Sequence, residues 1–354
     1  MARIDALFRY LKNNGGSDLH LFATLPPRVR IHGQLTDVEG RGVISDEELK
    51  ESLREICSEE QWLEFETRGD LDFAWALPGV ARFRVNFLNQ YNGVGAVFRL
   101  IPEKILSFDE LDIPKAIRDL AYLERGLVLI TGPTGSGKST TLASIINEIN
   151  ENFSKHIVTI EDPVEFVHMN KKSVFSQREV NNDTLSFADA LKATIRQDAD
   201  VILVGEMRDR ETIELAITAA EMGTLVFGTL HTNSATKTID RLIDAFPASQ
   251  QSQIRTTLAD SICAIGSQLL LPTSDGQGRC AAFEILLRTN SLPNIIRESN
   301  TTMLSSVIQS GVNEGMCAMD DSLEGLLRIG KISKASAMAR AKDKSRFRNR
   351  SGRF

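Results

Sequence analysis

A glycine-rich segment with one lysine and one serine carries the clearest chemistry in this chain. Residues 132–139 read Gly-Pro-Thr-Gly-Ser-Gly-Lys-Ser and fit G-x-x-x-x-G-K-[ST], the pattern of a loop that binds nucleoside triphosphates such as ATP. The backbone N–H groups of such a loop, and the positive end of the helix behind it, attract phosphate oxygens. In this pattern Lys138 reaches the β- and γ-phosphates, and the Ser139 hydroxyl ligates Mg²⁺. The candidate nucleotide-binding residues are Gly132, Pro133, Thr134, Gly135, Ser136, Gly137, Lys138, Ser139 and Thr140.

The residues around this loop predict the elements that must position it. An apolar run at 127–131 leads into the loop and indicates a strand. Apolar residues then recur at helical spacing, at Leu142, Ile145, Ile146 and Ile149. The order strand, loop, helix favours a phosphate-binding loop over a structural glycine turn.

Further apolar runs predict the sheet to which that strand belongs. Runs at 157–160, 201–204 and 225–228 alternate with helical stretches, which is typical of parallel strands covered on both faces. The predicted fold class is therefore α/β, wound around one parallel sheet. After residue 250 the chain is predicted to be mostly helical.

Polar residues follow three of these runs, where ligands bind in open α/β sheets. Glu161 and Asp162 follow the first run, Glu206 follows the second, and His231 follows the third. If these strands flank the strand of the phosphate loop, all three ends point toward the γ-phosphate.

Each of these side chains suits a step of phosphate hydrolysis. Glu206 can orient the attacking water and take its proton, unless it is only a surface or ion-paired glutamate. Many such enzymes place an aspartate just before the catalytic glutamate, where it helps to hold Mg²⁺. Here Gly205 occupies that position, so Glu161 is the candidate to hold the metal indirectly, through one of its ligands. His231 can donate to a γ-phosphate oxygen; the alternative is a histidine that is satisfied at a strand end.

Hydrolysis also needs positive charge against the developing negative charge, and arginines from a neighbouring domain or subunit can supply it. Arg82, Arg84 and Arg99 lie in predicted strands of the first domain. Arg82 and Arg84 are two residues apart, so their side chains share one face of a strand. The alternative to phosphate contact is that this face is only a solvated basic surface. Further arginines near the site, which the pattern does not rank, are Arg196, Arg208 and Arg210.

The pattern changes along the chain predict two domains. Residues 1–100 form a small α+β domain, 101–114 a linker between prolines, 115–338 the nucleotide-binding domain with a helical C-terminal part, and 339–354 a basic, disordered tail. This tail is either solvated or a contact for anionic lipid or an acidic partner. The predicted elements of the first domain are a short amphipathic helix built on Ile4, Leu7, Phe8 and Leu11, strands at 26–31 and 82–88, and a helix at 45–66 capped by Ser45.

Composition and charge narrow the function classes. The formal net charge is −6, although the tail alone holds seven Lys or Arg residues against one acidic residue, so the body is acidic and argues against a protein that coats nucleic acid. The four cysteines are isolated, without a C-x-x-C pair, and signal neither a zinc site nor a redox motif. Charged residues among the first positions argue against a signal peptide. No apolar stretch is long enough to span a bilayer. Together these features predict a cytoplasmic protein.

Several long motifs, in order, give the chain a specific resemblance. It resembles the PilT/PilU family of type IV pilus retraction ATPases, within the bacterial type II/type IV secretion ATPases. The matching segments are an opening strand motif at 16–21, a Walker A segment at 132–140, an aspartate box at 159–166, a Walker B region at 196–209 and a histidine box at 228–235.

The resemblance implies a PAS-like N-terminal domain, a RecA-like C-terminal domain, and a homo-hexamer that holds ATP and Mg²⁺ between the two domains. It implies that Glu206 is catalytic, that Glu161 helps with Mg²⁺ and water, and that Arg82, Arg84 and Arg99 approach the phosphates. It also implies work at the cytoplasmic face of the inner membrane, with the pilus platform protein as a partner, a paralogous retraction ATPase as a possible one, and no nucleic acid.

One segment departs from that family. Its retraction members typically carry Ala-Ile-Arg-Asn-Leu-Ile-Arg-Glu where residues 291–298 read Ser-Leu-Pro-Asn-Ile-Ile-Arg-Glu. Pro293 removes a backbone donor and an arginine together. The departure leaves open an accessory or altered role in retraction. The sequence also leaves open a pilus-extension or type II secretion ATPase, although the chain lacks their four-cysteine subdomain, and a nucleic-acid translocase.

Overall fold

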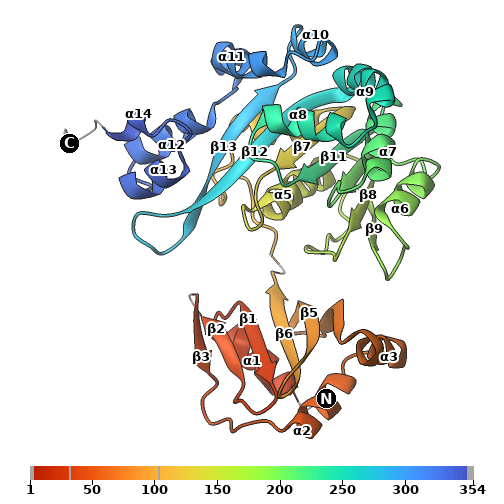
Figure 1. The fold of residues 1–354 in the computed structure, drawn as a ribbon, viewed down its shortest axis with the longest axis vertical. Coiled ribbons are helices and arrows are strands. Elements are labelled where there is room, and N and C mark those ends of the chain that lie inside the picture. Colours follow the sequence, from red (N-terminus) through yellow and green to blue (C-terminus); the bar gives the residue numbers. More distant parts are fainter. Residues whose placement is uncertain (1–3, 32, 103, 349–354) are drawn as a thin grey trace. The chain divides into compact units, whose positions relative to one another are not determined.

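The computed structural model describes residues 4–31, 33–102 and 104–348. Its chain divides into two compact units, one of Met1–Lys104 with Pro163–Val167 and one of Ile105–Asp162 with His168–Phe354 (Figure 1). The division falls inside the linker predicted at 101–114. The segment 163–167, which we assigned to the nucleotide-binding domain, groups with the first unit.

The first unit is built on a six-stranded antiparallel sheet in the order β3-β2-β1-β6-β5-β4. Its strands are β1 (Asp18–Phe22), β2 (Arg28–Ile31), β3 (Gln34–Asp37), β4 (Asp70–Leu77), β5 (Ala81–Gln90) and β6 (Gly93–Ile101). Alternate residues of β5, among them Phe83, Val85 and Phe87, are buried in one apolar core. The residues between them form the opposite face, so the sheet has one apolar and one polar side.

Three helices complete this unit: α1 (Asp5–Asn13), α2 (Asp46–Arg54) and α3 (Glu59–Arg68). The amphipathic helix predicted at the N-terminus is present, with Leu7, Phe8 and Leu11 buried. The single helix predicted for 45–66 was wrong, because Ser58 starts a second helix. Ser45 and Ser58 each form a capping box with the residue three positions later, and each box satisfies the backbone donors of a separate helix start.

The second unit is built on a seven-stranded sheet in the order β13-β12-β7-β11-β10-β8-β9. Its strands are β7 (Gly126–Thr131), β8 (His156–Glu161), β9 (Val174–Glu179), β10 (Val201–Val204), β11 (Leu225–Leu230), β12 (Ile262–Pro272) and β13 (Arg279–Leu287). All neighbours pair in parallel except β12 and β13, which form an antiparallel hairpin at one edge. The α/β fold predicted from the apolar runs is confirmed.

The prediction of a mostly helical chain after residue 250 was wrong at this hairpin. The apolar run 262–271 is short enough to suit a strand or a buried helix, and periodicity alone does not separate the two. Pairing with β7 on one side and β13 on the other settles it as a strand.

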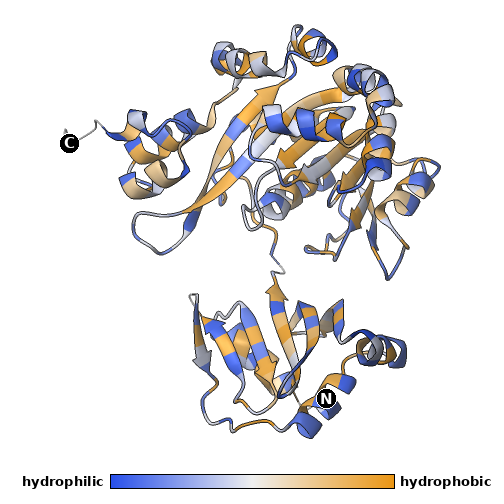
Figure 2. Ribbon diagram, in the orientation of Figure 1, coloured by the Kyte–Doolittle hydropathy of each residue, from blue (hydrophilic) through white to orange (hydrophobic). Residues whose placement is uncertain are grey.

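Helices cover both faces of this sheet, as expected for parallel strands. Leu127 and Leu129 of β7 pack with α6 to α11 on one face, whereas Val128 and Ile130 pack with α4, η1 and α5 on the other. Figure 2 shows the apolar strands between helices that turn polar residues outward. The helical elements are α4 (Lys115–Arg118), η1 (Asp119–Tyr122), α5 (Lys138–Asn152), α6 (Phe187–Thr194), α7 (Arg210–Glu221), α8 (Ala235–Asp244), α9 (Ala248–Ser261), α10 (Leu292–Arg297), η2 (Thr301–Met303), α11 (Leu304–Ser310), η3 (Val312–Glu314), α12 (Met319–Arg328), α13 (Lys334–Arg340) and α14 (Ser345–Arg348). Among the described residues, no helix combines the length and apolar character needed to cross a membrane.

The C-terminal segment differs from the disordered tail predicted for 339–354. Residues 339–348 complete α13 and form α14, with the Phe347 side chain buried and Arg346 paired with Asp321 and Glu324 of α12. The high charge of this segment predicted a solvated chain. In the fold, however, Arg346 forms ion pairs with acidic residues more than 20 positions earlier in the chain. Residues 349–354 of the predicted tail lie outside the described residues.

Candidate active site

The glycine-rich loop lies between β7 and α5, as predicted, and Lys138 is the first residue of α5. The Lys138 side chain is buried, and its Nζ donates to the carbonyl oxygens of Gly132 (2.9 Å) and Pro133 (3.2 Å). The ammonium group therefore lies across the loop at the N-terminus of a 15-residue helix. Helix and lysine together concentrate positive charge there, which suits phosphate oxygens.

Gly132 is required by both backbone conformation and space. Its φ is +147°, a value that residues with a side chain rarely adopt. A Cβ at this position would lie 2.3 Å from the backbone oxygen of Gln268 and 2.6 Å from Ser136 Oγ. The loop can close against β12 only because this residue has no side chain.

Gln268 on β12 is a site residue that the sequence did not reveal. It is buried, and its Oε1 accepts a hydrogen bond from Thr141 Oγ1 of α5 at 2.9 Å. One position earlier, Ser267 Oγ lies 2.8 Å from Thr131 Oγ1, the last residue before the loop. These contacts fix the loop from the neighbouring strand. A polar pair inside an apolar run, at Ser267-Gln268, is the only signal that pointed to them.

The loop fits the phosphates of a bound nucleotide. The Ser136 hydroxyl is buried and makes no hydrogen bond within the described part of the chain. A buried hydroxyl without a partner costs free energy unless a ligand or water satisfies it. Together with Lys138 and the N–H groups of the helix start, which have no acceptor within the helix, it forms a donor set for an anion rather than for a neutral group.

The strand order places the predicted catalytic residues on one side of the loop. From β7 outward the strands are β11, β10 and β8. His231 directly follows β11, Glu206 lies two residues after β10, and Glu161 is the last residue of β8. The strands therefore do not flank β7 on both sides. Because the strands of a sheet lie about 4.8 Å apart, the strand of Glu206 lies roughly 10 Å from β7, and that of Glu161 lies one strand farther.

Glu206 and His231 meet at the ends of β10 and β11. Glu206 Oε1 lies 2.8 Å from His231 Nε2, and Oε2 lies 2.7 Å from Arg208 Nη2. The carboxylate is mostly buried, with 19% of its side chain exposed. These residues line a surface pocket of about 410 Å³ together with Thr232 and Arg241. The pocket combines one carboxylate with several nitrogen donors, which suits a water molecule and an anion side by side.

The surroundings of Glu206 hold it in the charged form. Burial by itself raises the pKa of its carboxyl, but the hydrogen bond and charge of Arg208, followed by His231, outweigh burial, and the net pKa is lowered. A group with a lowered pKa is ionised at neutral pH and protonates only as the pH falls below its ordinary range. Glu206 is therefore a carboxylate at neutral pH, able to accept a proton or orient a water.

Arg208→Gln should move the acid limb of ATP turnover. Removing the guanidinium removes the largest influence that lowers the pKa of Glu206, so we expect kcat to begin its fall at a higher pH than in the unaltered protein. The measurement is kcat against pH for both proteins. Arg210→Gln is the control, because Arg210 is exposed and makes no ion pair in the described structure. Superimposable profiles for Arg208→Gln and the unaltered protein would contradict this role.

Glu161 lies beside Glu206 at the end of the next strand. Its Oε1 accepts hydrogen bonds from Thr159 Oγ1 at 2.7 Å and from Gln177 Nε2 of β9 at 3.4 Å. A Cβ on Gly205 would lie 3.1 Å from the oxygen of Ile160 and 3.3 Å from Cα of Glu161. The strand that carries Glu206 thus packs closely against Glu161 through a glycine. A side chain at the position before Glu206 would therefore press on the backbone of β8.

Arg82, Arg84 and Arg99 share one face of the sheet in the first unit. Arg84 and Arg99 are direct partners in the β5–β6 register, and Arg82 lies two residues from Arg84. Arg99 Nε donates to Asp18 at 2.8 Å, and Arg84 is exposed without an ion pair among the described residues. The predicted common face is therefore present. Whether these arginines meet phosphate stays a prediction.

Comparisons with known proteins decide the family. The family model described as type II/IV secretion system protein matches residues 4–306. This chain belongs to that family. Within it the chain is of the PilT/PilU type, as the motifs predicted, and its second unit is the RecA-like ATPase domain behind a smaller N-terminal domain.

Three similar proteins match this chain over most of their own length. The type IV pilus retractation ATPase PilT of Pseudomonas aeruginosa is 46% identical over 344 residues, which cover 97% of this chain and 99% of the relative. The twitching motility protein of Neisseria gonorrhoeae is 50% identical over 317 residues, 90% of this chain and 84% of the relative. The crystal structure of the pilus retraction motor PilT with bound ADP superposes with a TM-score of 0.90 at 42% identity and covers 98% of each chain.

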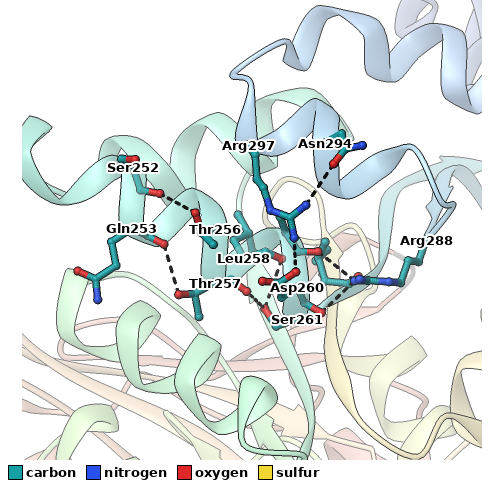
Figure 3. Close-up of polar contacts among 12 residues, drawn as sticks. Ser252, Gln253, Thr256, Thr257, Leu258, Asp260, Ser261, Arg288, Asn294 and Arg297 are labelled. Carbon is teal, nitrogen blue, oxygen red and sulfur yellow. Dashed lines mark hydrogen bonds and ion pairs between the residues drawn. The ribbon is translucent and has the colours of Figure 1, made fainter.

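The segment that departs from the retraction motif of this family is a regular helix. Pro293 stands in the first turn of α10, where its missing N–H would lack a helical partner anyway. The arginine that the motif keeps, Arg297, pairs with Asp260 at the end of α9 (Figure 3). Arg288 donates to three carbonyl oxygens around the same helix end, those of Ala259, Asp260 and Ile262. The proline thus leaves α10 and its attachment to α9 intact.

Proposed function

We propose that this PilT/PilU-type ATPase is a hexameric motor that hydrolyses ATP to retract type IV pili. One observation carries the proposal: the chain is 46% identical to a retraction ATPase over 97% of its length. The phosphate loop and the Glu206–His231 pair support it, because their geometry suits hydrolysis. We further propose that it works at the cytoplasmic face of the inner membrane, against the pilus platform protein.

ATP binding begins at the glycine-rich loop. The α5 N-terminus and Lys138 take the β- and γ-phosphates, and the Ser136 hydroxyl gains the partner that it lacks. The residues that would hold Mg²⁺ are Ser139 directly and Glu161 through water. Mg²⁺, when bound, neutralises part of the phosphate charge and orients the β- and γ-oxygens.

Hydrolysis then depends on the pocket at the end of β10. Glu206 orients a water molecule toward the γ-phosphorus and takes its proton, while His231 Nε2, bonded to the same carboxylate, helps to hold it in position. The charge that develops on the phosphate oxygens needs further cations, for which the arginine face of the first unit is the proposed source.

Arg84→Ala should lower kcat by about a hundredfold, the order of loss for one donor to a developing anion. Arg84 is the best single test of the arginine face because no acidic side chain neutralises it in the described structure, whereas Arg99 is held by Asp18. We expect nucleotide affinity to change much less than kcat, which steady-state kinetics and a fluorescent ADP titration would measure. Arg28→Ala is the matched control, since Arg28 lies in the same sheet but is paired with Asp37. Equal rates for the two variants would rule out phosphate contact by Arg84.

Conversion of hydrolysis into motion is the last part of the proposal. We propose that nucleotide state changes the angle between the two units, and that successive subunits of the hexamer do so in turn. Small-angle scattering of the assembled protein with ATP analogue, with ADP and without nucleotide tests it. Identical scattering in all three states would contradict the coupling.

The candidate roles differ in what they predict for pili. Type II secretion proteins such as that of Pseudomonas aeruginosa match only 46% of this chain, so retraction is the better supported role. An accessory role remains the second candidate because residues 291–293 depart from the retraction motif and the PilU of Pseudomonas aeruginosa is 39% identical over 95% of the chain. Deletion of the gene, with pilus dynamics scored by fluorescence, separates these roles. Pili that persist without retracting support a main motor, weakened retraction supports an accessory paralogue, and loss of pili supports extension.

A further inference from the structure

Glu284 is a buried carboxylate that the predicted mechanism does not use. It lies on β13, with 5% of its side chain exposed, and both of its oxygens are occupied. Oε1 accepts a hydrogen bond from the backbone N–H of Ala235 at 2.9 Å, and Oε2 pairs with Lys342 Nζ at 2.5 Å. A carboxylate is expensive to bury, and these two partners compensate that cost.

The Ala235 contact holds the start of α8, and α8 and the loop before it both contribute to the active-site pocket. His231 lies in the four-residue loop just before the helix, and Arg241 lies within it. The loop is held at its helix side by the Ser234 cap and by a 2.7 Å contact between the Thr232 and Thr238 hydroxyls. Glu284 is the one side chain among these contacts that comes from another element of the sheet. It therefore ties the loop and the start of α8 to β13.

Lys342 is itself held in place by a docked segment, residues 341–348, which we call the C-terminal strap. Both oxygens of buried Asp320 accept backbone N–H groups of the strap, those of Lys342 and Asp343, each at 2.8 Å. Phe347 is buried, and Arg346 pairs with two acidic residues of α12. Figure 1 shows α12, α13 and α14 grouped beside β13, which α12 contacts. The strap thus presents one lysine to Glu284 in a defined position.

We propose that Glu284 is a positioning residue for ATP hydrolysis, and that the C-terminal strap supplies the positive charge that lets it act. Glu284 holds the α8 start so that His231 reaches Glu206, and Lys342 keeps the buried carboxylate compensated. The inference deepens the proposed function and rests on it. It assigns the basic C-terminal segment a task inside the ATPase domain, in addition to any contact with a partner.

Glu284→Leu removes the acceptor, and Glu284→Gln keeps it. We expect Glu284→Leu to lower kcat about tenfold to a hundredfold, since a small misplacement of a catalytic group has effects of that size. Glu284→Gln retains an oxygen for the Ala235 N–H and should stay within about threefold of the unaltered protein. In both variants KM for ATP and the affinity for ADP should change by less than about twofold, because the phosphates are bound by the separate loop at Lys138.

Lys342→Met tests the strap, because it leaves Glu284 buried without its counter-charge. We expect a fall in kcat of about tenfold, again with little change in KM. In the double variant Glu284→Gln with Lys342→Met no charge remains to be compensated, so kcat should recover to within about threefold. Lys344→Met is the matched control, since Lys344 lies in the same strap and is exposed, without an ion pair in the part of the chain described.

The outcomes separate this inference from the proposed function. Unaltered kcat in Glu284→Leu, equal defects in the Leu and Gln variants, or no recovery in the double variant would each overturn it. A loss of kcat that is matched by a loss of ADP affinity and of thermal stability would also overturn it, by showing a merely structural role. If the full-length protein itself hydrolyses no ATP, the proposed function fails, whereas active protein with an indifferent Glu284→Leu variant leaves that function standing.

Discussion

Lys138→Ala is expected to abolish tight ATP binding and, with it, measurable turnover. The ammonium group is buried at the start of α5 and donates to two carbonyl oxygens of the loop, so it already occupies the position where phosphate charge must be compensated. Without it the phosphates enter a loop that has lost its buried lysine. Loss of one partner of a buried charge pair weakens binding on the order of a hundredfold or more.

The measurement is a titration with a fluorescent ATP analogue, followed by steady-state hydrolysis. Lys192→Ala serves as the matched control, because Lys192 is an exposed helical lysine that pairs with Glu211 on the surface. Thermal unfolding without nucleotide should be little altered in Lys138→Ala, since the hydrogen bonds that the lysine gives up are made to loop carbonyls. Near-normal turnover in this variant would mean that the nucleotide binds elsewhere.

Glu206→Ala is expected to leave a protein that binds ATP and hydrolyses it very slowly. Removal of a general base costs about 10²- to 10⁴-fold in rate. The same substitution releases Arg208 and His231 from the carboxylate, so the pocket becomes more positive and the affinity for ATP should hold or increase. Low kcat with retained binding is the signature of a group that acts in the transition state.

Single-turnover hydrolysis with ATP bound in advance separates the chemical step from binding and release. Glu206→Gln should resemble Glu206→Ala, because an amide has the shape of the carboxylate but cannot take a proton. Glu221→Ala, at the exposed end of α7, is the control for loss of an acidic residue. If both Glu206 variants turn over normally, the base lies elsewhere, and Glu161 is the next residue to replace.

Local features of this chain were predictable from sequence because they depend on residues close in the chain. The glycines of the phosphate loop allow its tight turn. The continuous apolar run before the loop indicates a strand, and the helical spacing of apolar residues after it indicates a helix. The strands that precede Glu206 and His231, and the strand that ends at Glu161, were recognisable as apolar runs followed by polar residues. The capping box at Ser45 was predictable for the same reason, since it involves a residue only three positions away.

The order of the strands and the partners of the charged residues were decided by the tertiary structure alone. Periodicity does not state which strands pair, so it could not show that β7 lies between β11 and β12, or that Gln268 of β12 supports the loop. It also could not choose Arg208 from several nearby arginines, because only the fold brings its guanidinium to Glu206. The charges of the C-terminal strap suggested a solvated tail until their acidic partners, distant in sequence, were placed beside them. Hydrogen bonds and ion pairs depend on distances of a few ångströms in space, whatever the separation of the two residues along the chain. A sequence pattern records only the separation along the chain.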